Sequence, residues 1–237
     1  KHLMVALSKV ELEKNLAPKD LKNILGQKTS QFSQEARYQV GMEKNNTSLE
    51  SIYASIWSEL KEGARKRKHP FHLCFLSTIS HKNFSAESRI VILRDVNVKD
   101  LLLRSNCDIR SSKAKDIRKN PNTTLLFYDQ ARKVQIRIKT ESEIVDNISI
   151  VQPIWDASQE ISRRCYYAPQ PPSSNLRSPF SNELLDLDNE KLGINIFGLI
   201  VSKAIEIDYL ELNYDGHIRC HYLLKDDNLI SSSWVAP

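Results

Sequence analysis

The stretch Ser88-Arg-Ile-Val-Ile-Leu-Arg94 sets a basic residue, Arg89, inside an apolar and β-branched strand. A cation in such a strand is costly unless an anion meets it. Successive side chains of a strand alternate between its two faces, so Arg89 and Arg94 are expected to point in opposite directions. We therefore expect one arginine to bind a phosphate and the other to lie against a ring or substrate. The simpler interpretation is an edge strand protected by charge.

A polar loop follows, Ser105-Asn-Cys-Asp-Ile-Arg-Ser-Ser-Lys113, at the start of a predicted helix. Hydroxyl groups, cations and free amide groups at a helix start are typical of an anion site. Ser111 is a candidate N-cap residue, and the cations Arg110 and Lys113 bracket it. Alone, the loop could be an ordinary helix cap with a surface lysine. Together with the strand before it, the loop predicts a phosphate site on a β scaffold, and hence a phosphorylated cofactor.

The rest of the chain predicts mainly antiparallel β structure with covering helices. A capping box at residues 47–50 predicts a helix that ends near Gly63. Further helices are expected at residues 111–119 and 148–162. Predicted strands cover residues 71–78, 88–93, 101–103, 123–128, 134–145, 197–201, 204–212 and 218–224, with a last strand before Pro237. Tight turns between these strands favour an α+β barrel over a parallel α/β sheet.

Length and composition suit one large domain with an extension. The chain has 237 residues and a net charge of +5. We divide it into an N-terminal helical extension of unknown role, residues 1–48, and a barrel domain, residues 49–237. No apolar run is long enough to cross a bilayer, and the first residues lack a signal-peptide pattern, so a cytoplasmic protein is expected. Four scattered cysteines indicate reduced thiols rather than disulfides or a zinc site.

Two other parts of the sequence are weaker candidates for a functional site than this strand and loop. His217 and His221 lie four residues apart on one predicted strand, but no third ligand accompanies them, so no metal is expected. The basic run at residues 65–68 could contact nucleic acid. We interpret it as a solvated helix end, where the helix dipole favours cations, so nucleic-acid binding is not expected.

The order of five segments resembles the pyridoxamine 5′-phosphate oxidase-like flavoproteins. The segments are SRIVILR, LLLRSN, RSSKAKDIRKNP, LLFY and VQIRI, and the ending IEIDYLELNYDGHIRCHYLL with SSSWVAP is similar too. This resemblance implies a six-stranded antiparallel split β-barrel that binds FMN. It also implies a homodimer with FMN at the subunit interface.

The resemblance also assigns residues to the cofactor. Arg89 and Lys113 would bind the FMN phosphate, and the backbone of residues 90–93 would lie along the flavin ring. Gln135 would reach the isoalloxazine, and Arg94 would lie beside both flavin and substrate as the candidate catalytic residue. With Arg110 from the loop, the expected cofactor residues are Arg89, Ile90, Val91, Ile92, Arg94, Ser105, Arg110, Ser111, Ser112, Lys113 and Gln135.

The substrate end departs from the oxidases themselves. Leu210 stands where they carry a tryptophan over the flavin, and His221 stands near an expected arginine, with Arg219 offset from it. The candidate substrate residues are Ser162, Arg163, Arg164 and His221. We expect an FMN-dependent oxidoreductase in which a phosphorylated or aromatic substrate gives a hydride to flavin N5. The alternative is a non-catalytic flavin- or haem-binding split-barrel module.

Overall fold

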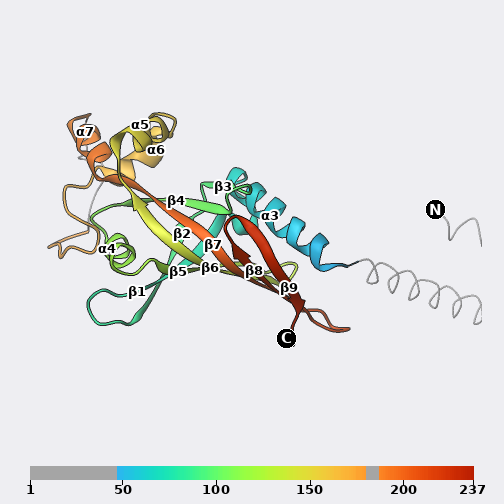
Figure 1. Ribbon diagram of the computed structural model, residues 1–237. Coiled ribbons are helices and arrows are strands. Elements are labelled where there is room, and N and C mark those ends of the chain that lie inside the picture. Colours follow the sequence, from blue (N-terminus) through green and yellow to red (C-terminus); the bar gives the residue numbers. More distant parts are fainter. Residues whose placement is uncertain (1–46, 180–186) are drawn as a thin grey trace, which may run out of the picture. The chain divides into compact units, whose positions relative to one another are not determined.

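A computed structural model of the chain describes residues 47–179 and 187–237 (Figure 1). Leu49–Pro237 forms one compact unit. The expected N-terminal extension, residues 1–48, lies almost wholly outside the described residues, so its role and boundary stay predictions.

The centre of the fold is one curled antiparallel sheet. Its main path runs β2-β1-β5-β6-β7-β4-β3, while β8 pairs with β7 and β9 pairs with β8. The predicted mainly β split barrel with covering helices is confirmed, although the described sheet has nine strands where six were expected. The strands are β1 (Leu73–Ile79), β2 (Ala86–Ile92), β3 (Asp95–Asn97), β4 (Leu102–Asp108), β5 (Asn122–Asp129), β6 (Val134–Val145), β7 (Phe197–Glu211), β8 (Ile218–Lys225) and β9 (Asn228–Trp234).

Strand β7 is continuous where two strands were predicted, at residues 197–201 and 204–212, and it carries a β-bulge. Lys139 pairs with Glu206, but the next residue, Thr140, pairs with Ala204. Ile205 is therefore an extra residue on β7, and side-chain alternation changes phase there. The predicted gap at residues 202–203 lies before the bulge, and both of these residues pair with β4 and β6 as part of the one strand.

Helices cover the sheet and fill its interior. They are α3 (Leu49–Arg65), α4 (Ser112–Lys119), α5 (Ile148–Asp156), α6 (Glu160–Arg163) and α7 (Leu187–Ile196), with short 3₁₀ helices η1 (Pro70–His72) and η2 (Arg164–Tyr166). The single helix predicted over 148–162 is two helices. The Ser158 hydroxyl donates to the carbonyl of Ile154 at 2.7 Å, a local bond of the kind that competes with regular secondary structure.

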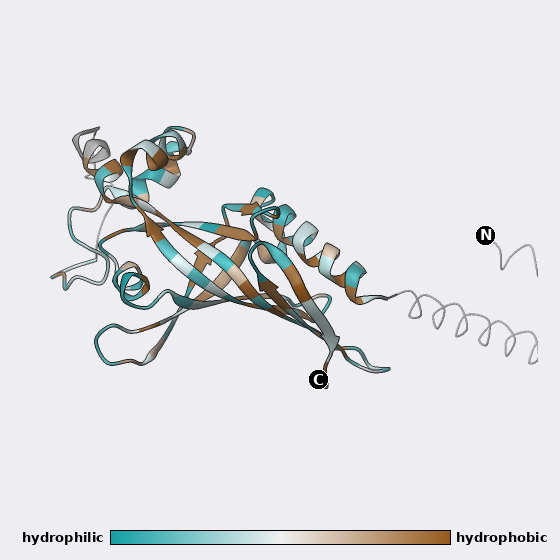
Figure 2. Cartoon of the chain, in the orientation of Figure 1, coloured by the Kyte–Doolittle hydropathy of each residue, from teal (hydrophilic) through white to brown (hydrophobic). Residues whose placement is uncertain are grey.

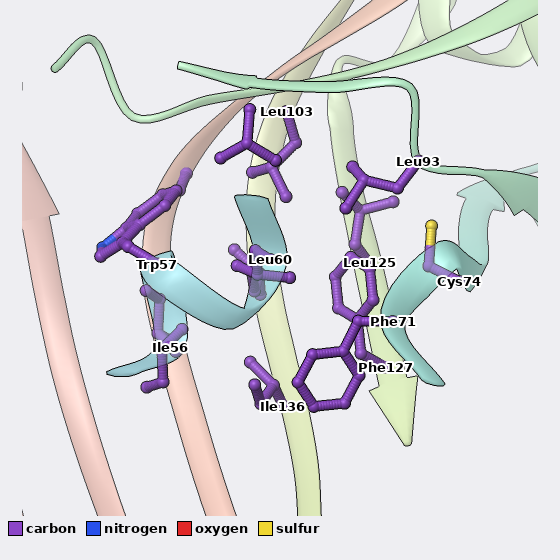
Figure 3. Close-up of a cluster of buried hydrophobic side chains, with 14 of the residues drawn as sticks. Ile56, Trp57, Leu60, Phe71, Cys74, Leu93, Leu103, Leu125, Phe127 and Ile136 are labelled. Carbon is purple, nitrogen blue, oxygen red and sulfur yellow. The ribbon is translucent and has the colours of Figure 1, made fainter. Parts of the chain in front are cut away.

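Helix α3 supplies one side of the main core. It is amphipathic, with hydrophobic and hydrophilic stretches alternating along it (Figure 2). Ile56, Trp57 and Leu60 are buried and lie among side chains from the sheet, including Leu103 and Phe127 (Figure 3).

Replacing Leu60 with alanine should lower the free energy of unfolding by about 2–5 kcal/mol, because the side chain is fully buried and its removal leaves a cavity. Urea denaturation followed by tryptophan fluorescence and circular dichroism measures the change. Lys61→Ala, one residue further along the same helix and exposed, is the control and should change stability by less than about 0.5 kcal/mol. Equal effects of the two substitutions would contradict the packing of α3.

A smaller core joins α5 and η2 to the start of β7. Trp155, Tyr167 and Phe197 are buried in it, and the Trp155 and Phe197 ring centroids are 5.2 Å apart. Gly193 of α7 approaches this cluster closely, since an added Cβ would lie 2.7 Å from the Trp155 ring. This second core fixes the helices beside the β4–β7 end of the sheet.

All four cysteines are free thiols, as predicted; Cys74, Cys107 and Cys220 are buried, and Cys165 is exposed. Within residues 47–179 and 187–237, no helix has the length and apolar character needed to span a membrane.

Candidate functional site

The sheet is split between β2 and β4. Strand β2 pairs only with β1, and β4 pairs with β7 and, at its beginning, with β3. Beyond the point where the Arg94 amide donates to the Arg104 carbonyl at 2.8 Å, the two strands lie near one another without pairing. Two edges with free backbone groups, one on β2 and one on Ser105–Asp108 of β4, therefore face the same opening.

Arg89 lies on the inner face of β2, with Val91. Its guanidinium donates through Nη1 to Thr78 Oγ1 at 2.7 Å and to the Leu76 carbonyl at 3.3 Å. Val91 and Leu93 are buried on this face, whereas Ile90 on the opposite face is 57% exposed. The alternation expected for this strand is thus confirmed.

Lys113 stands in the first turn of α4, near Arg89. Its ammonium group has no hydrogen-bond or ion-pair partner among the residues described. Burial lowers the pKa of Lys113, and the neighbouring charge of Arg89 lowers it further. Burial likewise lowers the pKa of Arg89, against the opposing effect of Asp116. Two partly buried cations that disfavour each other's charge are suited to bind an anion between them.

The start of α4 adds amide groups to these cations. Ser111 is the N-cap residue, as predicted, but its hydroxyl donates to the Asp108 carbonyl at 2.6 Å instead of capping the helix. The first amides of α4 therefore have no side-chain cap, and the helix dipole favours an anion at this end. Ser112 is exposed and Ser105 is buried beside the same opening.

Arg110 is occupied elsewhere. Its guanidinium forms a bidentate pair with Asp108, with Nη2 2.7 Å from Oδ2. It also donates to the carbonyls of Ala168, Pro169 and Gln170. The side chain expected to contact the cofactor thus ties the loop after η2 to the end of β4.

Arg94, two residues after the end of β2, lines a narrow pocket. Asn106, Ser162, Arg163 and Tyr166 line the same pocket, together with Trp155, Ser158 and Phe197. The Arg163 guanidinium donates to the Ser158 carbonyl at 3.1 Å and lies 5.9 Å from the Trp155 ring centroid. Burial raises the pKa of Tyr166, so that residue stays a neutral phenol. The pocket combines two arginines with aromatic walls.

The other two substrate candidates lie elsewhere. Arg164 is exposed and pairs with Glu160 at 2.7 Å. His221 lies on β8 and pairs through Nε2 with Glu206 at 3.0 Å. The structure therefore brings Ser162 and Arg163, but neither Arg164 nor His221, to the pocket of Arg94.

A wider pocket lies where β1 ends and β5 begins, and several of its lining residues are threonines. Thr78, Thr123 and Thr140 belong to it, and its single lysine, Lys139, pairs with Glu206 at 2.9 Å. Its cation is already neutralised, so this pocket is a poorer phosphate site than the Arg89–Lys113 pair.

Gln135 is separated from Arg89 within one chain. It lies on β6 opposite Tyr128 and Leu210, and the strands β1 and β5 lie between β6 and β2. Three strand spacings of about 4.8 Å place it about 14 Å across the sheet from β2. Its side chain also lies on the other face of the sheet from Arg89, since its neighbours Val134 and Ile136 are the buried ones.

Sequence reasoning missed three residues that surround Arg89: Thr78, His81 and Asp116. They come from β1, from the β1–β2 hairpin and from α4. Their separation in sequence, with Asp116 35 residues after His81, leaves no local spacing that could have revealed them.

Comparisons with known proteins cover the same part of the chain. Residues 54–146 match the family model described as pyridoxamine 5′-phosphate oxidase, FMN-binding domain. This segment includes Arg89, Lys113 and Gln135. A curated relative, pyridoxine/pyridoxamine 5′-phosphate oxidase 2 of Arabidopsis thaliana, is 25% identical over 170 residues, covering 68% of this chain and 85% of the relative.

Two solved structures share the fold. A pyridoxamine 5′-phosphate oxidase-related, FMN-binding protein from Nostoc punctiforme PCC 73102 has a TM-score of 0.64 at 21% identity, covering 78% of this chain and 96% of that one. PhzG from Burkholderia lata 383, in complex with tetrahydrophenazine-1-carboxylic acid, has a TM-score of 0.58 at 15% identity, covering 82% and 95%. The resemblance to the pyridoxamine 5′-phosphate oxidase-like proteins is thereby confirmed in both sequence and fold.

Proposed function

We propose that this protein binds FMN in the split between β2 and β4 and acts as an oxidoreductase. The observation that carries the proposal is the pair of partly buried cations, Arg89 and Lys113, beside the uncapped start of α4. A phosphate there would receive guanidinium, ammonium and amide donors together. Ser112 and the buried Ser105 stand beside this position and complete a polar lining.

The flavin ring would lie along the free edge of β2. The backbone of Ile90, Val91 and Ile92 offers donors and acceptors there, and the edge of β4 at Ser105 and Asn106 faces them. Apolar side chains from both strands make the surrounding bed, which suits a planar ring with polar edges. Bound FMN would supply the hydride acceptor, at N5, while the protein holds the ring and the substrate in place.

The pocket of Arg94 would hold the substrate. Arg94 and Arg163 supply positive charge, Ser162 a hydroxyl group, and Trp155 and Tyr166 aromatic walls. This combination suits an anionic substrate that carries a ring, and a phosphate ester of a pyridine is one such compound. Arg94 would orient the substrate against the flavin and stabilise its negative charge, because guanidinium stays protonated at any physiological pH.

Arg110 receives a different role in this proposal from the one expected. Its five donors serve Asp108 and the loop at residues 168–170, so it would fix the wall of the substrate pocket and not the phosphate. Arg164 and His221 would likewise stay in their ion pairs at the surface.

The non-catalytic alternative has its own support. Leu210 replaces the tryptophan of the oxidases, and His221 is paired with Glu206 instead of being free for a ligand. A protein that holds flavin without turning over a substrate would need only the phosphate end of the site.

The decisive experiment is an absorption spectrum of the purified protein followed by an anaerobic titration. We expect a flavin spectrum with bound FMN, bleaching on addition of an anionic ring substrate such as pyridoxamine 5′-phosphate, and recovery of colour in air. A flavin spectrum that no substrate of this class bleaches would favour the binding module. Protein that takes up no FMN at high concentration would contradict both.

A further inference from the structure

Asp116 is a buried carboxylate on α4 that faces β1 and the β1–β2 hairpin. Only 1% of the residue is exposed. Its Oδ1 accepts a hydrogen bond from the His81 amide at 2.9 Å and lies 2.6 Å from His81 Nδ1. Its Oδ2 accepts from the Thr78 hydroxyl at 3.0 Å. A buried charge with three partners has a specific task in the fold or in a site.

Those contacts lead to Arg89. Thr78 Oγ1 accepts from Arg89 Nη1 at 2.7 Å, while Arg89 Nη2 lies 3.9 Å from Asp116 Oδ2. A threonine hydroxyl has one proton to donate. Because Thr78 gives its proton to Asp116, its lone pairs are directed to the guanidinium. The hydroxyl therefore acts as a spacer between the carboxylate and the arginine.

The spacer matters for a ligand. A carboxylate in bidentate contact with Arg89 would occupy the planar fork that a phosphate needs. At 3.9 Å, Asp116 attracts the guanidinium without occupying that fork. Burial alone would raise the pKa of Asp116, but hydrogen bonds from His81 and Thr78 lower it overall, so the carboxylate is charged. One negative charge then faces two cations, and the local balance stays positive for an anion.

We propose that Asp116, acting through Thr78 and braced by His81, is a positioning residue that orients Arg89 toward the phosphate of FMN. His81 belongs to the hairpin that carries the chain into β2, so its two contacts with Asp116 also fix that hairpin against α4. The two elements that bear the cations, β2 and α4, are thereby held at a fixed separation. This inference rests on the proposed FMN function.

The test compares FMN with riboflavin, which lacks the phosphate. Flavin fluorescence quenching gives both affinities for the wild type and for Asp116→Asn and Thr78→Val. We expect FMN affinity to fall about tenfold in each variant, as a misdirected charged hydrogen bond implies, with riboflavin affinity changed less than about twofold. Asp146→Asn is the matched control, because Asp146 also pairs with a residue of α4, Arg118, but on the exposed side. It should leave both affinities unchanged.

A second measurement separates positioning from general destabilisation. In an Arg89→Ala background, Asp116→Asn should have no further effect on FMN affinity, since it acts only through that arginine. Equal losses of FMN and riboflavin affinity, or a full additional loss in that background, would overturn the inference. If Asp116→Asn does not fold, Thr78→Val decides by the same criteria. A wild type that binds neither flavin would instead overturn the proposed function, and this inference with it.

Discussion

Replacing both Arg89 and Lys113 with alanine is expected to weaken FMN binding by at least about 100-fold. A hydrogen bond to a charged group contributes about 1.5–3 kcal/mol, so two of them account for roughly 3–6 kcal/mol, and each 1.4 kcal/mol is a factor of ten. Riboflavin affinity should change far less, because neither side chain is assigned to the ring. Burial and the charge of Arg89 both disfavour the charged form of Lys113. Removing the two side chains should therefore leave the free protein folded.

Isothermal titration or flavin fluorescence measures the two affinities, and circular dichroism checks the fold. The matched control is Lys115→Ala with Lys119→Ala, which removes the same net charge from exposed positions of the same helix. That control should bind FMN within about twofold of the wild type apart from a screened long-range effect. Undiminished FMN affinity in the Arg89–Lys113 variant would remove the phosphate site from this end of β2.

The phosphate end of the site could be predicted because its information is local. Alternation along residues 88–94 predicts which side chains share a face, and the structure shows it at Arg89, Ile90 and Val91 of β2, while Arg94 lies two residues beyond the end of that strand. The loop before Lys113 carries its hydroxyls and cations in one short segment that becomes the start of α4. Each half of the site therefore lies in one short segment, although β3 and β4 separate β2 from α4 in the chain.

The substrate end could not be predicted because it depends on tertiary packing. Arg163 and Arg164 are neighbours with the same chemistry, and nothing in the sequence separates them. The break at Ser158 and the switch from α6 to η2 turn Arg163 toward Trp155 and Arg164 toward Glu160. The single helix predicted over residues 148–162 does not lead to these two orientations.

Arg110 is a second residue whose role depends on contacts far away in the sequence. Its position in the loop is typical of a residue that binds an anion, yet its guanidinium pairs with Asp108, two residues earlier. The three carbonyls it binds lie about sixty residues later in the chain, as the contact between Arg110 and Gln170 shows. Long-range partners of this kind leave no trace in local spacing.

The second prediction concerns the outer face of strands β2, β1 and β5. We expect this face to form an interface between two copies of the chain. Phe75 pairs with Ile90 across β1 and β2, and these side chains are 45% and 57% exposed. On the same face, Leu73 of β1 and Tyr128 of β5 are 50% and 46% exposed. An antiparallel sheet with one solvated face should be polar there, so a contiguous apolar face indicates a covered surface.

A second copy is the occupant that fits the site. Gln135 lies on β6, the strand next to β5, and its side chain is on this outer face, opposite to that of Arg89. In a twofold dimer, both subunits use the same surface patch, so residues near the patch in one subunit lie close to the other subunit. Gln135 of one subunit would then reach the flavin held by Arg89 and Lys113 of the other.

Leu73→Glu with Phe75→Glu should therefore give a monomer that also binds FMN poorly. Each subunit would bring unpaired charges into an apolar interface, which costs at least about 3 kcal/mol, on the order of a hundredfold or more in the dimer dissociation constant. Sedimentation velocity measures the mass, and flavin fluorescence the affinity. The control is Ile161→Glu, which adds a charge at a 74% exposed apolar position of α6 and should leave a dimer.

The joint readout distinguishes a shared site from a merely dimeric protein. Neither Leu73 nor Phe75 is assigned to the cofactor, and both lie on the face of the sheet opposite to that of Arg89. A monomeric variant that keeps full FMN affinity would mean that one chain forms the whole site and that Gln135 has no part in it. A variant that loses FMN affinity along with its partner, while the inner face of β2 still packs normally by circular dichroism and denaturation, would require the second copy in the site.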